Sequence, residues 1–342
     1  MLCSVMMATK KLKQILNSNT QYNATWKRQT YIIEGINHKL VTENAMMVCR
    51  DKGKTIVIIN SDEYSKKVHI FQTENNFHTL QKNPSSKDHK QLLKTLQHCN
   101  LIIDKKQIKY LTQKEPQPPT LKAQIKLYKP GNPIRPLISH MNAPTYKLAK
   151  HLIVILHRHL HLNYQYSVSN STALAKYLTK LKINENHKII TYDIKDLYVK
   201  IPIQETLRIA KSMLLKENNT QTTKQIITLL ETVLKQNYFS FQNNIYQPEK
   251  VVSVGSPISG TIAEIFLQHI ENIHIKHLMD TKNIVYYTRY VDDILLKYDT
   301  KYTNADIIHE YRNNIHTNLQ LNPTHKNNGH ISSQSFNNQK PF

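Results

Sequence analysis

The sequence is poor in three features that would each define a class of protein: cysteine, acidic side chains and long apolar runs. It has three cysteines, Cys3, Cys49 and Cys99, and no Cys-x-x-Cys spacing. This pattern argues against a zinc ribbon and a disulfide framework, and it predicts a reducing compartment. The longest apolar run, near 151–157, is far shorter than the roughly 20 residues that cross a bilayer. We find no secretion or anchoring signal, so an intracellular protein is expected.

Acidic residues are scarce, because 24 Asp and Glu stand against 46 Lys and Arg in 342 residues, a formal net charge of +22. Spread positive charge favours binding to a phosphate backbone, since binding releases the condensed counterions. The alternative is that the positive charge keeps the protein soluble or faces a membrane. No basic amphipathic helix dominates, so we expect nucleic acid rather than a membrane as the partner.

Two of the few acids are neighbours, in Tyr290-Val291-Asp292-Asp293. The β-rich runs 284–290 and 294–298 flank them, which predicts a β-hairpin with carboxylates at its tip. Adjacent acids repel unless a cation neutralises them, and hard oxygen ligands suit Mg²⁺. A solvated turn is the alternative, because Asp is a common turn residue.

A third acid has a similar setting. Asp193 ends the β-branched and aromatic run 188–193. If the two strands are neighbours, Asp193, Asp292 and Asp293 can hold the same pair of Mg²⁺ ions, with Mn²⁺ as a possible substitute. Two such ions, roughly 3.5 to 4 Å apart, stabilise the attacking and leaving oxygens of an in-line phosphoryl transfer, as in a polymerase.

The segments 193–202, 254–266 and 290–293 resemble, in the right order, motifs A, B and C in the palm of reverse transcriptases. Together with 126–136 upstream, their form is most similar to the enzymes of Penelope-like retroelements. The resemblance runs from about Asp51 to about Thr324. It implies an RNA-directed DNA polymerase that uses an RNA template, a DNA primer and dNTPs.

The resemblance also implies nucleotide contacts in the fingers. Lys129 and Arg135 flank the turn residues 130–133, and in the family the matching hairpin folds over the triphosphate of the incoming nucleotide. Lys126 is a second candidate, and ordinary basic surface is the alternative for both lysines. The family carries an early Asp-Lys-Gly element like that at 51–53, so Lys52 is a candidate contact to nucleic acid, with a solvated turn lysine as the alternative.

Further site residues follow from the palm motifs. An aromatic ring at Tyr198 would exclude a ribose 2′-hydroxyl and select dNTPs, with a core tyrosine as the alternative. The backbone carbonyl of Ile194 is an additional metal ligand. Gly255 would let the backbone approach a nucleotide or template strand, with Ser256 as N-cap and Pro257 in the first helical turn. An ordinary buried helix entry is the alternative for Ser256 and Pro257.

The expected fold class is α+β: the fingers and palm of a right-hand polymerase, an antiparallel sheet backed by helices, with the thumb missing. We expect an N-terminal extension over 1–50, fingers over 51–187, the palm over 188–300, and the palm end with a truncated polar tail over 301–342. Relatives continue there into a thumb and commonly a GIY-YIG endonuclease. Apolar spacing and capping residues predict helices near 10–16, 88–96, 142–157, 169–181, 202–216, 222–235, 257–278 and 304–316.

The function predicted from the sequence is therefore an RNA-directed DNA polymerase of a retroelement, located in the nucleus. The alternative is a catalytically inactive, nucleic-acid-binding remnant of such an element. A third and weaker reading is an inactive scaffold that binds no nucleic acid.

Overall fold

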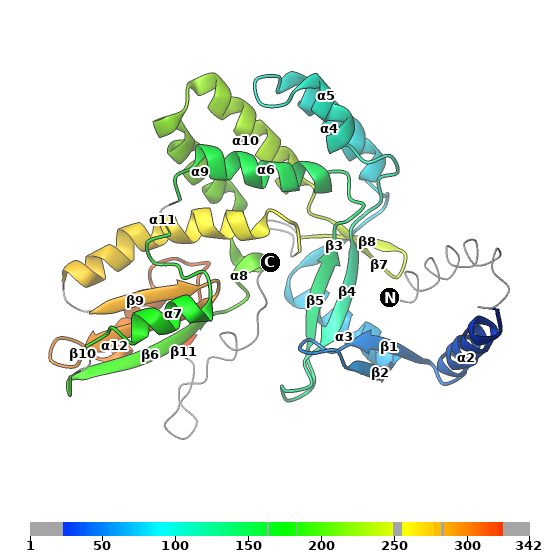
Figure 1. Ribbon diagram of the computed structural model, residues 1–342, viewed down its shortest axis with the longest axis horizontal. Coiled ribbons are helices and arrows are strands. Elements are labelled where there is room, and N and C mark those ends of the chain that lie inside the picture. The colour runs from blue at the N-terminus through cyan, green and yellow to red at the C-terminus, as the bar shows by residue number, and fades with distance from the viewer. Residues whose placement is uncertain (1–22, 163, 183, 249–254, 282–283, 324–342) are drawn as a thin grey trace. The chain divides into compact units, whose positions relative to one another are not determined.

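The computed structural model describes residues 23–162, 164–182, 184–248, 255–281 and 284–323 (Figure 1). The chain forms two compact units. The smaller unit consists of Met1–Glu74 and Ala123–Pro136, and the larger unit of Asn75–Lys122 and Leu137–Phe342. The predicted fingers region 51–187 therefore contributes to both units, and the functional division at 50, 187 and 300 stays a prediction.

The smaller unit contains α2 (Asn23–Thr42), the antiparallel pair β1 (Ala45–Cys49) and β2 (Ile56–Asn60), and α3 (Ser61–Glu74). The side chain of Asn60 accepts hydrogen bonds from the backbone N–H groups of Asp62 and Glu63, so it caps α3. The hydroxyl of Tyr64 on α3 accepts a bond from the N–H of Ala123 and donates to its carbonyl. These bonds fix the inserted segment 123–136 to the unit.

The larger unit is built from helices around one apolar core. It contains a four-stranded sheet, and a second, five-stranded sheet has strands in both units. Its helices are α4 (Ser85–His98), α5 (Lys105–Leu111), α6 (Tyr146–His159), α7 (Ser171–Leu178), α8 (Leu197–Lys200), α9 (Ile203–Glu217), α10 (Thr220–Lys235), α11 (Ser259–Asp280) and α12 (Ala305–Asn313). Contact between α10 and α4, α6 and α9, and between α9 and α11, closes the core. Each predicted helix within the described residues is present, and the one near 10–16 lies outside them.

The first sheet has the strand order β11-β6-β10-β9 and is antiparallel throughout. Its strands are β6 (His187–Ile194), β9 (Tyr286–Tyr290), β10 (Asp293–Asp299) and β11 (Leu321–Pro323). Strand β10 is buried over most of its length, which explains the apolar run Ile294–Leu296 at its centre. Since β6 and β10 are neighbours, the two acid-bearing strands lie side by side, as the sequence predicts.

The second sheet has the order β3-β8-β7-β4-β5. Its strands are β3 (Phe77–Leu80), β4 (Thr120–Ile125), β5 (Ile134–Ser139), β7 (Phe239–Phe241) and β8 (Asn244–Pro248). Gln242 and Asn243 join β7 to β8 with positive φ angles of 45° and 67°. Positive φ at both central residues is the signature of a type I′ hairpin turn.

The fold is thus α+β, with largely antiparallel sheets backed by helices. Among the described helices, none combines the length and apolar character that a membrane crossing requires.

Candidate active site

The three predicted acids lie at one end of the first sheet. Asp193 on β6 lies directly opposite Asp293 on β10 in the register of the two strands. The N–H of Ile194 donates a 2.9 Å hydrogen bond to the carbonyl of Asp292, the residue that precedes Asp293. Directly opposed side chains share a face, with Cβ atoms about 4.5 to 5.5 Å apart. Asp193 is exposed, Asp292 half-buried and Asp293 buried, so the group is open to solvent on one side.

Asp292 owes its position to a two-residue turn, because Tyr290 and Asp293 are paired across β9 and β10. In this turn Val291 has a φ of 54°. The left-handed region is strained for a β-branched residue, and it persists only where the surroundings enforce it.

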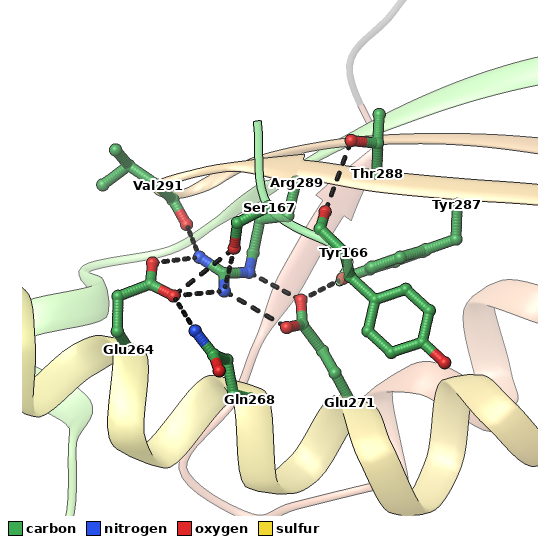
Figure 2. Close-up of polar contacts among 9 residues, drawn as sticks. All are labelled: Tyr166, Ser167, Glu264, Gln268, Glu271, Tyr287, Thr288, Arg289 and Val291. Atoms are coloured by element: carbon green, nitrogen blue, oxygen red, sulfur yellow. Dashed lines mark hydrogen bonds and ion pairs between the residues drawn. The ribbon is translucent and has the colours of Figure 1, made fainter. Parts of the chain in front are cut away.

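The side chain of Arg289 holds this turn from below (Figure 2). Its NH1 donates 3.0 Å to the carbonyl of Val291 and 2.9 Å to Oε1 of Glu264. Its Nε and NH2 donate 2.6 and 3.2 Å to the carboxylate of Glu271. Glu264 and Glu271 both belong to α11, so one buried arginine ties the helix that follows Gly255 to the turn that carries Asp292.

Four further groups complete the cluster. NH2 of Arg289 donates to Oγ of Ser167 at 3.0 Å and to Oε2 of Glu264 at 3.1 Å. The hydroxyl of Tyr287 donates to Glu271 at 2.8 Å. The side-chain amide of Gln268 donates to Glu264 at 3.1 Å. The guanidinium of Arg312 on α12 lies 5.3 Å from the centre of the Tyr287 ring. The cluster therefore has bonded partners in α11, β9 and the loop before α7, and it contacts α12.

Burial and pairing set the charges of this cluster. Burial alone would lower the pKa of Arg289, but the charge of Glu271 and the bonds to both glutamates raise it well above its ordinary value. Burial alone would raise the pKa of Glu264, but the bond and charge of Arg289 lower it. The guanidinium of Arg289 and the carboxylate of Glu264 are thus ionised at neutral pH.

The palm candidates Ile194 and Tyr198 lie next to the acids. Ile194 is buried, with its N–H bonded to Asp292. Tyr198 is on the short helix α8, is partly exposed and packs against the apolar core. A core contact and a nucleotide contact are both compatible with this position, so the role of the ring stays a prediction.

Gly255 has a φ of 91°, and a Cβ placed there would lie 2.3 Å from the carbonyl oxygen of Ile138. Glycine is required because this chain's own backbone approaches, and contact with a nucleotide remains a prediction. The capping prediction was wrong: α11 begins at Ser259, and its N-cap is Ile258 without a side-chain bond. Ser256 instead accepts a backbone bond from the N–H of Ser259, so it and Pro257 form a turn before the helix.

In the smaller unit, Lys126, Lys129 and Arg135 lie in and beside the loop between β4 and β5. NH1 of Arg135 forms a 2.8 Å ion pair with Asp51, whose side chain is 1% exposed while that of Arg135 is 51% exposed. The hydroxyl of Tyr128 donates 2.7 Å to the other oxygen of Asp51. Burial would raise the pKa of Asp51, but the bonds from Arg135 and Tyr128 lower it, so Asp51 is a fixed anchor for Arg135.

Sequence reasoning did not identify Arg289, Glu264, Glu271 or Asp51. A sequence pattern could have identified the first three. Glu264 and Glu271 are seven residues apart in an apolar helix and therefore share a face, and Arg289 interrupts an apolar strand. Asp51 was passed over for its neighbour Lys52, whose ammonium lies 5.2 Å from the Tyr128 ring. A buried anion beside a lysine has no distinct pattern in the sequence.

The donor set fits divalent metal ions. Carboxylates of neighbouring strands meet in register, and these are the hard oxygen ligands that Mg²⁺ prefers. Within the described ranges, no cluster of three or more His, Cys, Asp or Glu side chains is arranged to hold an ion unaided. Mg²⁺ ordinarily takes one or two carboxylates and completes its shell with water and substrate phosphates, so an open carboxylate pair suits it.

A small cavity beneath the sheet is a different feature. It has a volume of about 30 Å³, and its lining includes Glu271, Arg289 and Arg312. Nucleotide-sized pockets measure about 300 to 1,000 Å³, so this cavity has room only for water and is part of the support of the turn.

Comparisons with known proteins identify a family and a fold. Residues 127–326 match the profile of the family described as reverse transcriptase (RNA-dependent DNA polymerase). A comparison with curated proteins found no match.

Two solved structures illustrate the similarity in fold. The telomerase of Candida albicans, in complex with a fragment of telomeric RNA, aligns with a TM-score of 0.56 and 13% identity over 85% of this chain and 51% of that chain. The apo telomerase of Candida tropicalis aligns with a TM-score of 0.54 and 11% identity over 86% and 53%. The chain thus spans about half the length of these telomerases, and at such identities the similarity concerns the fold alone.

Proposed function

Because the chain belongs to the reverse transcriptase (RNA-dependent DNA polymerase) family, we propose that it carries an RNA-directed DNA polymerase site at the end of the β6–β10 pair. The observation that carries the proposal is the register of the three acids, with Asp193 opposite Asp293 and Ile194 bonded to Asp292. The proposed partners are an RNA template, a DNA primer and dNTPs. The retroelement origin, of Penelope-like type, and the nuclear location are parts of the same proposal.

The reaction is a nucleotidyl transfer. The 3′-oxygen of the primer attacks the α-phosphorus of a dNTP, the bond to the β-phosphate oxygen breaks, pyrophosphate leaves, and the hydroxyl proton passes to solvent. Asp193, Asp292 and Asp293, with the carbonyl of Ile194, are the groups that would hold two Mg²⁺ ions. When bound, such ions stabilise the charge on the attacking and leaving oxygens.

The remaining residues bind and orient the nucleotide. Arg135 offers a planar guanidinium to a phosphate, and Asp51 fixes its direction. Lys129 and Lys126 add positive charge at the same loop. Gly255, Ser256 and Pro257 form the turn before α11 that would face the nucleotide or template. Arg289 keeps the strained Val291 turn in place, so that Asp292 needs no rearrangement before reaction.

The test is primer extension on poly-rA with an oligo-dT primer, dTTP and Mg²⁺. We expect incorporation by the unmodified chain and a loss of at least about a hundredfold in Asp292→Asn, because a charge acting on the transition state is removed. Asp306→Asn, an exposed acid on α12, is the matched control and should retain activity. Equal rates in the two variants would refute the site. Salt-sensitive RNA binding without extension would instead favour the inactive remnant.

The sugar selectivity assigned to Tyr198 has its own test. We expect Tyr198→Val to raise the use of UTP relative to dTTP by at least about tenfold, because the ring no longer excludes the 2′-hydroxyl. Tyr302→Val, at a tyrosine that is 61% exposed, is the control. A selectivity that does not change would make Tyr198 a core residue only.

A further inference from the structure

Helices α5 and α6 of the larger unit contact one another (Figure 1). Helices α4, α9, α10, α11 and α12 each contain at least one acidic residue, whereas α5 and α6, like α7 and α8, contain none. The acids next to α5 in sequence are Asp104 and Glu115. Asp104 caps α5 by accepting a bond from the N–H of Lys106, and Glu115 lies beyond the end of that helix.

The positive side chains of α6 form one stripe. Leu148, Leu152 and Leu156 face the core, which leaves Lys147, Lys150, Val154 and Arg158 on the outer side at helical spacing. Lys150 and Arg158 are exposed, and Val154 is 55% exposed. From Lys147 to Arg158 the stripe is about 16 Å long.

The stripe continues onto α5. The ammonium of Lys147, in the first turn of α6, lies 5.9 Å from the centre of the Tyr110 ring, in the last turn of α5. The same ammonium donates 2.8 Å to the carbonyl of Thr112. Lys106 and Lys109 are exposed beside Tyr110, whose side chain is 72% exposed. We define the α5–α6 basic face as Lys106, Lys109, Tyr110, Lys147, Lys150 and Arg158.

The charges of this face act on one another. Burial lowers the pKa of His151 on α6, and the positive charge of Arg158 lowers it further. A row of cations without intervening acids is energetically costly unless an anion shares the space, and a polyanion does so along the whole row.

We propose that the α5–α6 basic face binds the phosphate backbone of a single-stranded nucleic acid, as a contact outside the catalytic site. A stripe about 16 Å long can contact successive phosphates of one strand. The exposed ring of Tyr110 and the apolar Val154 offer surfaces for bases, the combination of cations and aromatic rings that single-strand binders use. The choice of RNA over DNA rests on the proposed function, since the template is the single strand that such an enzyme handles.

The test compares two triple variants of the full chain. The first, Lys109→Gln with Lys150→Gln and Arg158→Gln, removes three charges from the α5–α6 basic face. The control, Arg208→Gln with Lys211→Gln and Lys216→Gln, removes three charges from exposed positions of α9. Affinity for a short fluorescein-labelled single-stranded RNA is measured by fluorescence anisotropy over a range of salt concentrations.

We expect the first variant to bind about tenfold to a hundredfold more weakly at 0.1 M salt, with a salt slope smaller by about 2, because each lost phosphate contact removes about 0.7 from the slope for a single strand. The control should change by less than about threefold. Equal losses in the two variants would overturn the proposal, even if the chain polymerises. An absence of polymerisation would leave this comparison intact, so the two proposals fail separately.

Further arms identify the ligand. Tyr110→Leu should weaken binding to single strands by at least about fivefold, because base stacking is lost, and should leave duplex binding unchanged. The affinities for RNA and DNA strands of the same length show which of the two nucleic acids this face prefers. If the first triple variant loses binding to phosphatidylserine vesicles but keeps its affinity for RNA, the face is a membrane contact and the proposal is refuted.

Discussion

Two arginines, one in each compact unit, show how differently one residue type is used. Arg289 is 1% exposed, and its nitrogens are bonded to Glu264, Glu271, Ser167 and the Val291 carbonyl. Arg135 is paired with Asp51, and its side chain is 51% exposed. Arg289 is therefore part of the support of the turn that carries Asp292, whereas the Arg135 side chain pairs with Asp51 and is half exposed to solvent.

The difference shows that the partners of an arginine, rather than the arginine itself, decide its role. A buried guanidinium must be fully paired, because an unpaired buried charge costs several kcal/mol. A guanidinium that pairs with a buried carboxylate and is half exposed lies where a phosphate can approach it from the solvent. The predictions below test this division, beginning with the largest effect.

Arg289→Met should destabilise the larger unit by about 3 to 5 kcal/mol, because it leaves Glu271 and Glu264 in or near the core without their cation. The free energy of unfolding in urea, followed by far-ultraviolet circular dichroism, measures this loss. Arg208→Met, at an exposed arginine of α9, should stay within about 0.5 kcal/mol.

A second variant separates charge from packing. Arg289→Met combined with Glu264→Gln and Glu271→Gln should recover part of the lost stability, because the uncompensated carboxylates are gone. If it recovers none, or if Arg289→Met is as mild as Arg208→Met, the buried charge cluster does not support the fold as described.

Arg135→Gln should impair nucleotide binding and leave the free energy of unfolding nearly unchanged, the opposite of what we expect for Arg289→Met. We expect KM for dTTP to rise about tenfold to a hundredfold, because a charged hydrogen bond to the triphosphate is lost, while the unfolding free energy changes by about 1 kcal/mol or less. Steady-state primer extension with varied dTTP is the measurement. Arg28→Gln, at an exposed arginine of α2 in the same unit, is the control. An unchanged KM together with a large loss of stability would place Arg135 in the same structural class as Arg289.

Much of the fold can be predicted from local patterns of apolar and polar residues in the sequence. The run Ile294–Leu296 of β10 is apolar because the strand is buried, and the leucines of α6 recur at helical spacing because they face the core. The candidate acids stood out because two neighbouring acids between apolar strands are unusual. The strand pairing places Asp193 opposite Asp293, and the catalytic role of the acids stays a prediction.

Other features depend on contacts that no local pattern encodes. The start of α11 was predicted too early, because Ser256 and Pro257 suit a helix entry as well as the turn that they form. The need for glycine at 255 comes from the backbone of Ile138, more than a hundred residues away in the chain. The pairing of Asp51 with Arg135 likewise joins the loop after β1 to strand β5, so a single sequence cannot reveal it.

The smallest expected effect concerns this last pair and its dependence on pH. The pKa of Asp51 is lower in the folded chain than in the unfolded chain, since Arg135 and Tyr128 stabilise the ionised form. The pair therefore contributes stability above the unfolded pKa of about 3.9, and this contribution is lost as the pH falls through the folded pKa. Because Arg135 is half exposed and screened by solvent, we expect a contribution of about 1 kcal/mol or less.

Urea unfolding of the unmodified chain and of Asp51→Asn between pH 3 and pH 7 measures this contribution as a difference. The difference should be largest near neutral pH and should shrink below about pH 4, because protonation of Asp51 then makes the two chains alike. Asp62→Asn, at an exposed acid of α3 in the same unit, is the control for general charge effects. A difference that is constant over this range would mean that Asp51 positions Arg135 by shape and hydrogen bonding alone, so the charge of its carboxylate would not contribute to the contrast with Arg289.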